Sequence, residues 1–491
     1  MKTFVAFLLT FALGSADINP RVFPDNFKFG VANAAPQIEG GWDEDGKGET
    51  IWDHLAHRHP EKIADGTGPD IASDSYHKYK EDVAMVKAMG LDHYRLSIAW
   101  SRILPTGYPD KVNQPGVQYY KNLFKELKAA GVEPMVTLYH WDLPQPLQKE
   151  LGGWLNESVA DLFAEYARIC FGLFNDDVKL WITINEPKQV CQSGYGYGEL
   201  APAIASSGVD DYVCSRNILL AHAKAYHIYD DEFRETNKGR IAMVIDTIWY
   251  EPGSDSPADI EAAERAMQFN YGLYGHPVHI GNWPQVVIDR VAERSRLAGY
   301  PKSRLPEFSK REIDYIKGTY DYIALNHYAT NMVNASDAPV KDTGYWNDIG
   351  ILTWRQPQWT GGEGGWFTVV PWGLRSLLVW LKKTYGDIEI LITENGYPDK
   401  TGVMEDDDRI AYFEGYLSAC LDAIYEDGIN LTYYTAWTII DDWEWLGGYT
   451  WFMGMHSVNF TDPGRARAPR KSAGWFTDMV KKRCLVKNCV K

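Results

Sequence analysis

Residues 181–187 read WITINEP and residues 390–396 read ILITENG. Each stretch is a short, apolar, β-branched run that ends in an acid, Glu186 in the first and Glu394 in the second. Runs of this kind are typical of parallel strands that are covered on both faces. The two stretches therefore predict two buried strands whose ends each present a carboxylate.

Comparable runs recur along the chain and alternate with amphipathic helical patterns. The predicted strands span 27–35, 93–100, 133–140, 179–185, 240–247, 320–328, 388–395 and 433–441. The predicted helices span 74–89, 116–130, 157–174, 209–237, 372–385 and 406–427. Eight strands in alternation with helices are the number that closes a barrel. An open doubly wound sheet would have a Gly-rich turn after an early strand, and the sequence has none there. We expect an α/β fold, a single (β/α)8 TIM barrel over residues 17–491 with long βα loops, especially at about 330–370.

The composition sets limits on size and on partners. The chain has 491 residues and a net charge of −17, from 49 Lys and Arg against 66 Asp and Glu. A barrel with long loops can hold this length as one domain. Duplex nucleic acid and anionic membranes require a basic face, so neither is expected as a partner. The 19 Trp and 30 Tyr exceed ordinary usage, and some of them are expected to line a pocket for a ligand such as a sugar.

The N-terminus has the pattern of a secretory signal peptide over residues 1–16. Lys2 supplies the positive end, residues 4–13 are mostly apolar, and residues 14–16 are small. The apolar run is too short to span a bilayer. The sequence therefore predicts a secreted, extracellular protein.

Six cysteines suit an oxidising compartment. Two pairs have the spacing of loop-closing disulfides, Cys191 with Cys214 and Cys484 with Cys489, although six cysteines allow 15 connectivities. The other two lie in apolar helical stretches and are expected to be buried thiols: Cys170 and Cys420.

Four Asn-x-Ser/Thr sequons permit glycosylation: Asn156, Asn334, Asn430 and Asn459. Asn430 runs directly into a predicted strand, so we expect it to be unmodified.

Chemistry in such barrels lies at the carboxyl ends of the strands. Nearly every predicted strand end carries polar or aromatic residues: Gln37, Glu39, Arg95, Trp100, His140, Trp141, Asn185, Glu186, Asn326, His327, Tyr328, Glu394, Asn395 and residues 437–445. A closed barrel brings Glu186 and Glu394 to opposite sides of one mouth. Two carboxylates that flank a glycosidic bond, one protonated and one ionised, are the groups that hydrolyse it. The alternative is that both glutamates only cap neighbouring helices.

Other chemistries have weaker signals. Residues 41–48 approach a P-loop, but Gly48 replaces the hydroxyl residue that would hold Mg²⁺. His54, His57 and His59 match no closed zinc site, and the sequence has no Gly-x-Ser-x-Gly motif. We therefore expect neither a metal nor a cofactor.

The sequence resembles family 1 glycoside hydrolases, in particular insect β-glucosidases and insect-type myrosinases. The resemblance extends from FPDNFKFG at residue 23 to RARAPRKSA at residue 465. Its motifs include QIEGGWDEDGKGETIWD, YRLSIAWSRILPTG, TLYHWDLPQPL, TINEP, LNHY, ITENG and TAWTIIDDWEW, in the expected order.

The resemblance implies a role for each matching residue. Glu186 would be the general acid/base and Glu394 the nucleophile, which in a retaining enzyme lie about 5–5.5 Å apart. Arg95 and Tyr328 would hold the nucleophile ionised. The positions that would contact substrate are Gln37, His140, Trp141, Asn185, Asn326, Tyr328, Trp437, Glu444 and Trp445. A carboxylate at Glu444 would accept from sugar hydroxyls and repel a 6-phosphate.

The chain departs from the family pattern at positions that line the outer pocket in relatives. These are Ala35-Pro36, Gly447 and residues 451–453. Lys188 and Arg355 could meet an anionic aglycone, or they are solvated surface charges.

The expected function is that of a secreted retaining β-glycosidase that hydrolyses β-D-glucosides from the non-reducing end. Its partner would be a small glucoside or oligosaccharide, and it would be a monomer or homodimer. The alternatives are a myrosinase that acts on glucosinolates, a non-catalytic sugar-binding protein, and a transglycosidase.

Overall fold

The computed structural model describes residues 18–336, 342–361 and 367–490, so the predicted signal peptide lies outside the described residues. Within that part of the chain, eight parallel strands close into a barrel in the order β1-β11-β10-β7-β5-β4-β3-β2. The barrel strands are β1 (Lys28–Ala32), β2 (His93–Ser97), β3 (Glu133–Tyr139), β4 (Leu180–Asn185), β5 (Arg240–Asp246), β7 (Ile323–Asn326), β10 (Ile390–Asn395) and β11 (Leu431–Trp437). Seven of these strands lie within a predicted strand range, and β11 begins two residues before its range. The predicted (β/α)8 barrel is confirmed.

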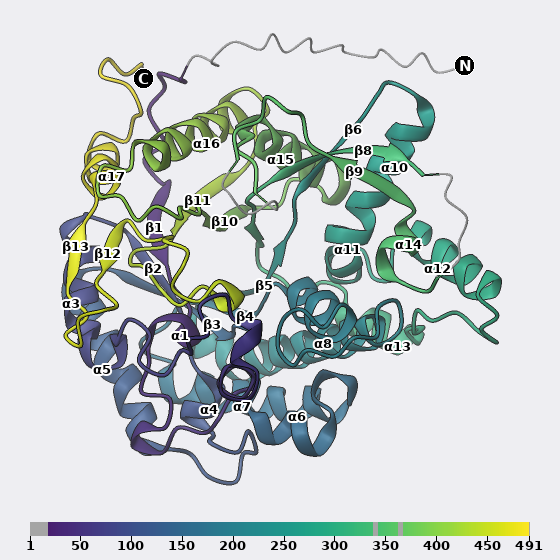
Figure 1. Ribbon diagram of the computed structural model, residues 1–491, viewed down its shortest axis with the longest axis horizontal. Coiled ribbons are helices and arrows are strands. Elements are labelled where there is room, and N and C mark those ends of the chain that lie inside the picture. The colour runs from purple at the N-terminus through teal and green to yellow at the C-terminus, as the bar shows by residue number, and fades with distance from the viewer. Residues whose placement is uncertain (1–17, 337–341, 362–366, 491) are drawn as a thin grey trace.

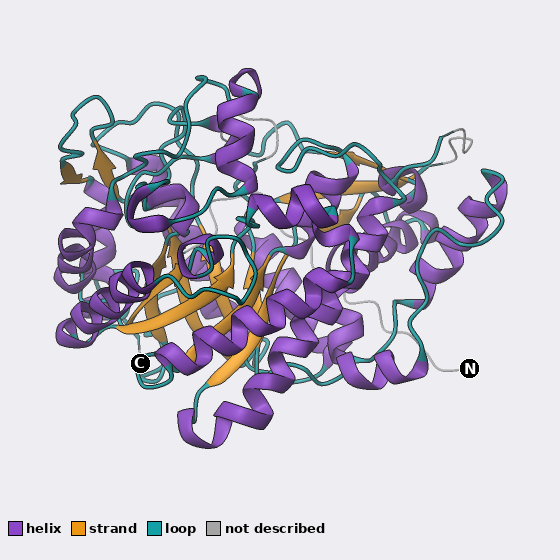
Figure 2. Ribbon diagram, turned by 90° about the horizontal axis from the view of Figure 1, so that it is seen from below, coloured by secondary structure: helices purple, strands orange, loops and turns teal. Residues whose placement is uncertain are grey.

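Helices surround the barrel, as Figures 1 and 2 show. The predicted ones are α3 (Ser75–Ala88), α5 (Gln114–Ala130), α7 (Ser158–Phe174), α8 (Asp210–Ile228) with α9 (Arg234–Asn237), α15 (Pro371–Tyr385) and α16 (Asp407–Tyr425). The boundaries of helix α5 show how the sequence determines where a helix begins and ends. Pro115 occupies its first turn, Leu123 and Leu127 are buried one turn apart, and Gly131 ends it at φ +75°.

The structure also contains elements that the sequence patterns do not predict. The additional helices are α1 (Ala35–Ile38), α2 (Ile51–Arg58), α4 (Trp100–Ile103), α6 (Gln145–Leu151), α10 (Pro257–Met267), α11 (Leu273–His279), α12 (Gln285–Leu297), α13 (Lys310–Ile316), α14 (Tyr345–Ile349) and α17 (Lys471–Lys482). Two small sheets join β6 (Trp249–Pro252), β8 (Thr330–Ala335) and β9 (Ile351–Trp354), and β12 (His456–Val458) with β13 (Arg467–Pro469). Short 3-10 or π turns lie at Glu44–Gly46, Pro60–Lys62, Gly153–Leu155, Gln189–Gly196, Tyr229–Phe233, Gln268–Gly272 and Trp445–Gly447.

Trp100 does not lie at the strand-end rim as expected. Strand β2 ends three residues earlier, and Trp100 begins helix α4. Its ring is completely buried and stacks on Tyr166 with the centroids 4.8 Å apart. Trp100 is therefore a core residue.

Glu39 is also turned away from the rim, into a buried ion pair with Arg102. Arg102 Nε donates to Glu39 Oε2 at 2.8 Å, and Tyr120 donates to Glu39 Oε1 at 2.7 Å. Both charged side chains are at most 5% exposed. A buried pair of this kind is a weak source of stability, but an orphaned member is costly.

We expect Glu39→Ala to lower the free energy of unfolding by about 3–5 kcal/mol, because it strands the Arg102 charge in the interior. The measurement is chemical denaturation followed by circular dichroism. The control is the double variant Glu39→Leu/Arg102→Met, which removes both charges and should recover most of the loss. Equal destabilisation of the single and double variants would contradict the explanation.

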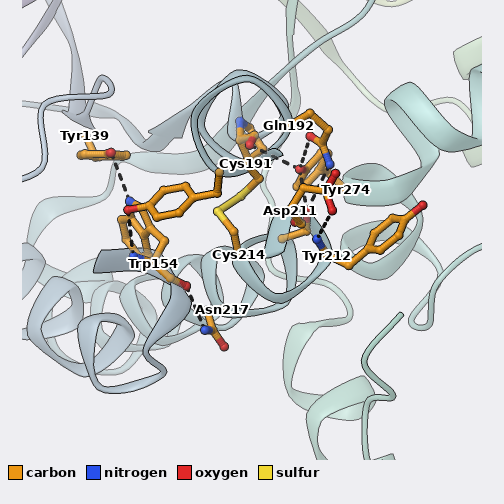
Figure 3. Close-up of a disulfide and its surroundings, with 12 residues drawn as sticks. Tyr139, Trp154, Cys191, Gln192, Asp211, Tyr212, Cys214, Asn217 and Tyr274 are labelled. Atoms are coloured by element: carbon orange, nitrogen blue, oxygen red, sulfur yellow. Dashed lines mark hydrogen bonds between the residues drawn. A yellow bond between two sulfur atoms is a disulfide. The ribbon is translucent and has the colours of Figure 1, made fainter. Parts of the chain in front are cut away.

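Both predicted cysteine pairs are confirmed as disulfides, and both predicted free thiols are buried. Figure 3 shows the Cys191–Cys214 disulfide, which joins the π turn Gln189–Gly196 after β4 to helix α8. Tyr274 strengthens the same junction, because its hydroxyl hydrogen-bonds to Gln192 Oε1 and Ser215 Oγ, each at 2.8 Å. The chain that follows Glu186 is thereby fixed to a barrel helix. None of the described helices is long and apolar enough to cross a membrane.

Candidate active site

A cavity of about 610 Å³ opens at the carboxyl ends of the barrel strands. Its lining includes both strand-end glutamates and most of the predicted substrate contacts: His140, Trp141, Glu186, Asn326, Tyr328, Glu394, Trp437, Glu444 and Trp445. The other predicted site residues are buried directly behind this lining: Gln37, Arg95 and Asn185. The structure therefore brings together all of the residues that the resemblance assigns to the site.

Glu394, on β10, is held by two hydrogen-bond donors. Arg95 Nη1 donates to Glu394 Oε1 at 2.5 Å, and the Tyr328 hydroxyl donates to Oε2 at 2.8 Å. The Glu394 side chain is 5% exposed and that of Arg95 is 1% exposed, so little solvent screens the ion pair. Both oxygens of Glu394 are stabilised in their charged form.

Glu186 follows β4 directly and has a different environment. Its backbone adopts φ +49°, a left-handed conformation that turns the chain out of the strand. Its Oε1 accepts a 2.7 Å hydrogen bond from Asn326 Nδ2, and an amide is a neutral donor. Lys188 is the nearest cation in the sequence, but it is paired with Asp246 at 2.7 Å.

These environments separate the protonation of the two carboxyl groups. Burial, with the negative charges of Asp246 and Glu394, holds the pKa of Glu186 well above its ordinary value. Burial also raises the pKa of Glu394, but the Arg95 charge and the Tyr328 hydrogen bond oppose that rise. When only one proton is present, it therefore resides on Glu186 and Glu394 is the anion.

Asn185 and Asn326 connect the glutamates to the rest of the barrel mouth. Asn185 Oδ1 accepts from Arg95 Nη2 at 2.6 Å and from Asn326 Nδ2 at 3.2 Å. Asn185 Nδ2 lies 3.1 Å from His140 Nε2. Burial and the Arg95 charge hold the pKa of His140 well below its usual value, so its imidazole is neutral and Nε2 is the acceptor.

Aromatic rings form one wall of the cavity. The His140 ring lies roughly parallel to Trp437 and Trp445, with centroids 5.9 and 6.0 Å away. Trp141 packs on Trp445 at 4.5 Å and donates through Nε1 to the Asn185 carbonyl. Flat apolar faces beside polar groups suit the alternating C–H and O–H surfaces of a sugar.

Gln37 and Glu444 form a polar corner of the cavity. Gln37 Nε2 donates to Glu444 Oε2 at 2.9 Å. Gln37 Oε1 is buried and accepts no hydrogen bond from any residue that the structure describes. Burial raises the pKa of Glu444 to about 7, although hydrogen bonds from Asp442 and Gln37 oppose that rise. The corner therefore offers acceptors for hydroxyl groups.

We call the part of the cavity lined by Lys188, Glu199, Asp246 and their neighbours the outer cavity. Asp246 is a functional residue there that the sequence analysis does not name. Asp246 is the last residue of β5, a position similar to that of Glu186 directly after β4. Its carboxylate accepts from Lys188 Nζ and, at 2.9 Å, from Gln189 Nε2. The same strand-end signal could have identified it. The two cations that were expected either to meet an aglycone or to be solvated have different placements. Lys188 lines the cavity, whereas Arg355 is not among its described lining residues and donates to Asn331 instead.

The positions at which the chain departs from the family pattern have mixed placements. Gly447, Trp451 and Met453 line the outer cavity together with apolar residues: Leu200, Ile248, Pro398 and Leu446. Ala35 and Pro36 do not belong to the described lining.

The three clustered histidines do not form a metal site. Each pairs with a different acid: His54 with Glu49, His57 with Asp70, and His59 with Glu61. No group of three or more His, Cys, Asp or Glu in the described ranges is arranged to hold a metal ion.

The chain is similar to known proteins over most of its length. The sequence profile of Glycosyl hydrolase family 1 matches residues 19–484. "Myrosinase 1" of Brevicoryne brassicae is 45% identical over 93% of this chain and 98% of its own length, and a human "Cytosolic beta-glucosidase" is 40% identical over 94% and 98%. The solved structure of an aphid myrosinase superposes with a TM-score of 0.90 at 45% identity, covering 94% of this chain and 100% of its own. A rice β-glucosidase superposes with a TM-score of 0.88 at 38% identity, over 95% and 98%. The chain therefore belongs to glycosyl hydrolase family 1, and it is an enzyme that hydrolyses glycosidic bonds.

Proposed function

We propose that the protein is a secreted, retaining β-D-glucosidase that removes a glucosyl unit from the non-reducing end of a small glucoside. The observation that carries the proposal is the unequal surroundings of the two buried carboxyls: Glu394 is bonded to the cationic Arg95, whereas Glu186 is bonded to a neutral amide. Hydrolysis with retention requires one protonated acid and one anionic nucleophile.

In the first step, a Glu394 oxygen attacks the anomeric carbon while Glu186 transfers its proton to the glycosidic oxygen. The bond between that carbon and the leaving oxygen breaks, and a covalent glucosyl ester forms on Glu394. Glu394 is then neutral, so the pKa of Glu186 falls and the carboxylate can act as a base. It takes a proton from water, the resulting hydroxide attacks the anomeric carbon, and Glu394 leaves.

The inner cavity supplies the contacts for glucose. Asn185 lies close enough to the two glutamates to bond the 2-hydroxyl, a contact that strengthens in the transition state. Trp437 would stack against the ring, and Gln37 Oε1 and Glu444 would accept from hydroxyls at the far end. The Glu444 carboxylate would repel a phosphorylated sugar.

The outer cavity favours an uncharged, apolar leaving group. Lys188 is the one cation among its described lining residues, and Asp246 neutralises it. Glu199 adds another negative charge to the same part of the lining. An anionic aglycone would therefore meet more repulsion than attraction.

A second candidate is a thioglucosidase that acts on glucosinolates. It is supported by the presence of Lys188 in the cavity and by the 45% identity to a protein named as an aphid myrosinase. The sulfate of a glucosinolate would have to compete with Asp246 for the Lys188 ammonium group.

Initial rates on an aryl β-glucoside, cellobiose and a glucosinolate, measured side by side, separate the two candidates. The β-glucosidase proposal expects the first two substrates to have the higher kcat/KM. A dominant rate on the glucosinolate would reject it in favour of the thioglucosidase. No cleavage of any β-glucoside, with binding retained, would reject both.

The Lys188–Asp246 pair should set the alkaline limit of activity. Asp246→Asn removes a negative charge that raises the pKa of Glu186, so Glu186 should lose its proton at lower pH. The alkaline limb of kcat/KM should move to lower pH, and it should move to higher pH in Lys188→Met, which removes the opposing charge. The measurement is the pH profile of kcat/KM for each variant. Shifts in the same direction for both would contradict this assignment.

Secretion can be checked by mapping N-glycans on protein exported from insect cells. Asn156 and Asn459 each accept through Oδ1 from the hydroxyl two residues later, and neither amide nitrogen donates to a residue in the described ranges. Asn334 Nδ2 instead donates to Asp259 at 2.8 Å. We expect glycans at Asn156 and Asn459 and none at Asn334. Peptide mass spectrometry with and without enzymatic deglycosylation tests this, and an occupied Asn334 in active protein would contradict it.

A further inference from the structure

Asp442 is a buried acid that the mechanism does not use. It lies in the loop that follows β11, two residues before Glu444, and its side chain has no exposed surface. Neither carboxyl oxygen accepts a hydrogen bond from an N–H or hydroxyl group of any described residue. The neighbouring Asp441 differs, because Arg470 binds it through two 2.8 Å hydrogen bonds.

The charged groups that act most strongly on Asp442 are acids. The Glu444 carboxyl lies within hydrogen-bonding reach of it, and the charges of Glu444, Asp441 and Glu394 all add negative potential. The cations nearest to those two acids, Arg470 and Arg95, are engaged by them. A carboxylate without a donor or a cation is strongly disfavoured in a protein interior, so Asp442 retains a proton.

We propose that Asp442 is a positioning residue, a neutral carboxylic acid whose O–H donates to Glu444 and fixes that carboxylate for the sugar. The pair shares one proton between two acids, in the manner of two carboxylates that cannot both ionise at close range. Gln37 holds the other side of Glu444 through its 2.9 Å hydrogen bond. Two donors thus orient Glu444 and leave its remaining lone pairs for hydroxyl groups.

The shared proton makes sugar binding sensitive to pH in one direction. The pKa of Asp442 is held well above its ordinary value by burial and by the Glu444 charge. When the shared proton is lost at alkaline pH, two adjacent anions repel each other and Glu444 loses its orientation. KM should then rise, while kcat, which depends on Glu186 and Glu394, should follow its own profile.

The test compares two substitutions at this position. In Asp442→Asn, the amide is a permanent donor, so KM at neutral pH should stay within about threefold of the original and its alkaline rise should disappear. In Asp442→Leu, no donor remains, and KM should rise roughly tenfold across the whole pH range. An alkaline rise that persists in Asp442→Asn would overturn the proposal, as would an unchanged KM in Asp442→Leu.

A measurement without turnover guards against a variant that fails to fold and against a wrong function. Infrared difference spectra of the original protein minus Asp442→Asn at neutral pH should contain the C=O band of a protonated carboxylic acid. The exposed Asp408→Asn is the matched control and should give no such band. Absence of the band for Asp442 would overturn the proposal.

The proposal rests on the proposed role of Glu444 in sugar binding, and Glu444→Gln separates the two. A Glu444→Gln variant with unchanged KM would reject that role, while the infrared band would still report the shared proton.

Discussion

Glu394→Gln is expected to lower kcat by roughly 10⁴-fold or more while the protein stays folded. The amide cannot form a glycosyl ester, but it has the same shape and can still accept from Tyr328. The fold loss of kcat should be equal for substrates with good and poor leaving groups, because both need the nucleophile. The measurement is steady-state turnover of an aryl β-glucoside, with thermal unfolding as the check on folding.

Folding has to be checked for this variant, because Arg95 loses the carboxylate with which it is paired. Arg95 also donates to the Thr393 carbonyl and to Asn185, so the guanidinium keeps hydrogen bonds in the variant. Some destabilisation is expected, but not unfolding. Residual activity above about 1% of the original, in a homogeneous preparation, would contradict the assignment of Glu394 as nucleophile.

Glu186→Gln should have an effect that depends on the leaving group. For an unactivated alkyl glucoside, the loss of proton donation should lower kcat/KM by about 10²–10⁴-fold. For a nitrophenyl glucoside that leaves without protonation, the first step should be nearly unchanged. The second step still lacks its base, so a burst of one equivalent of nitrophenol should precede a slow steady state.

Stopped-flow absorbance measures that burst, and mass spectrometry should detect the glucosyl ester on Glu394. The matched control is Glu199→Gln, which changes an acid of the outer cavity that takes no part in proton transfer. Equal losses for both leaving groups would contradict the role of Glu186 as acid/base.

The sequence could predict the barrel and the inner site because both depend on local patterns. An apolar run followed by a polar residue locates a strand end, and closure of the barrel brings the strand ends together. The placement of Glu186, Glu394 and Asn326 follows from this reasoning alone.

The same pattern failed where the direction of a side chain depends on distant partners. Glu39 follows β1 as expected, yet it turns inward because Arg102 and Tyr120 bind it. The strand-end pattern reaches Asp246, but it does not predict the pairing of Asp246 with Lys188, which lies in another loop. The sequence also could not predict that Asp442 is buried without a hydrogen-bond donor. The alternation of apolar and polar residues does not show which groups surround a side chain.

The hydrogen-bond network of the site also has a consequence for how the chain acquires activity. Arg95 and Asn185 come from β2 and β4, in the first half of the sequence, whereas Asn326 and Glu394 come from β7 and β10 in the second. Each half of the chain thus carries one of the two glutamates, and each glutamate receives a donor from the other half: Glu394 from Arg95 and Glu186 from Asn326. Neither half can form the site by itself, so enzymatic activity reports that the two halves of one molecule have met and closed the barrel.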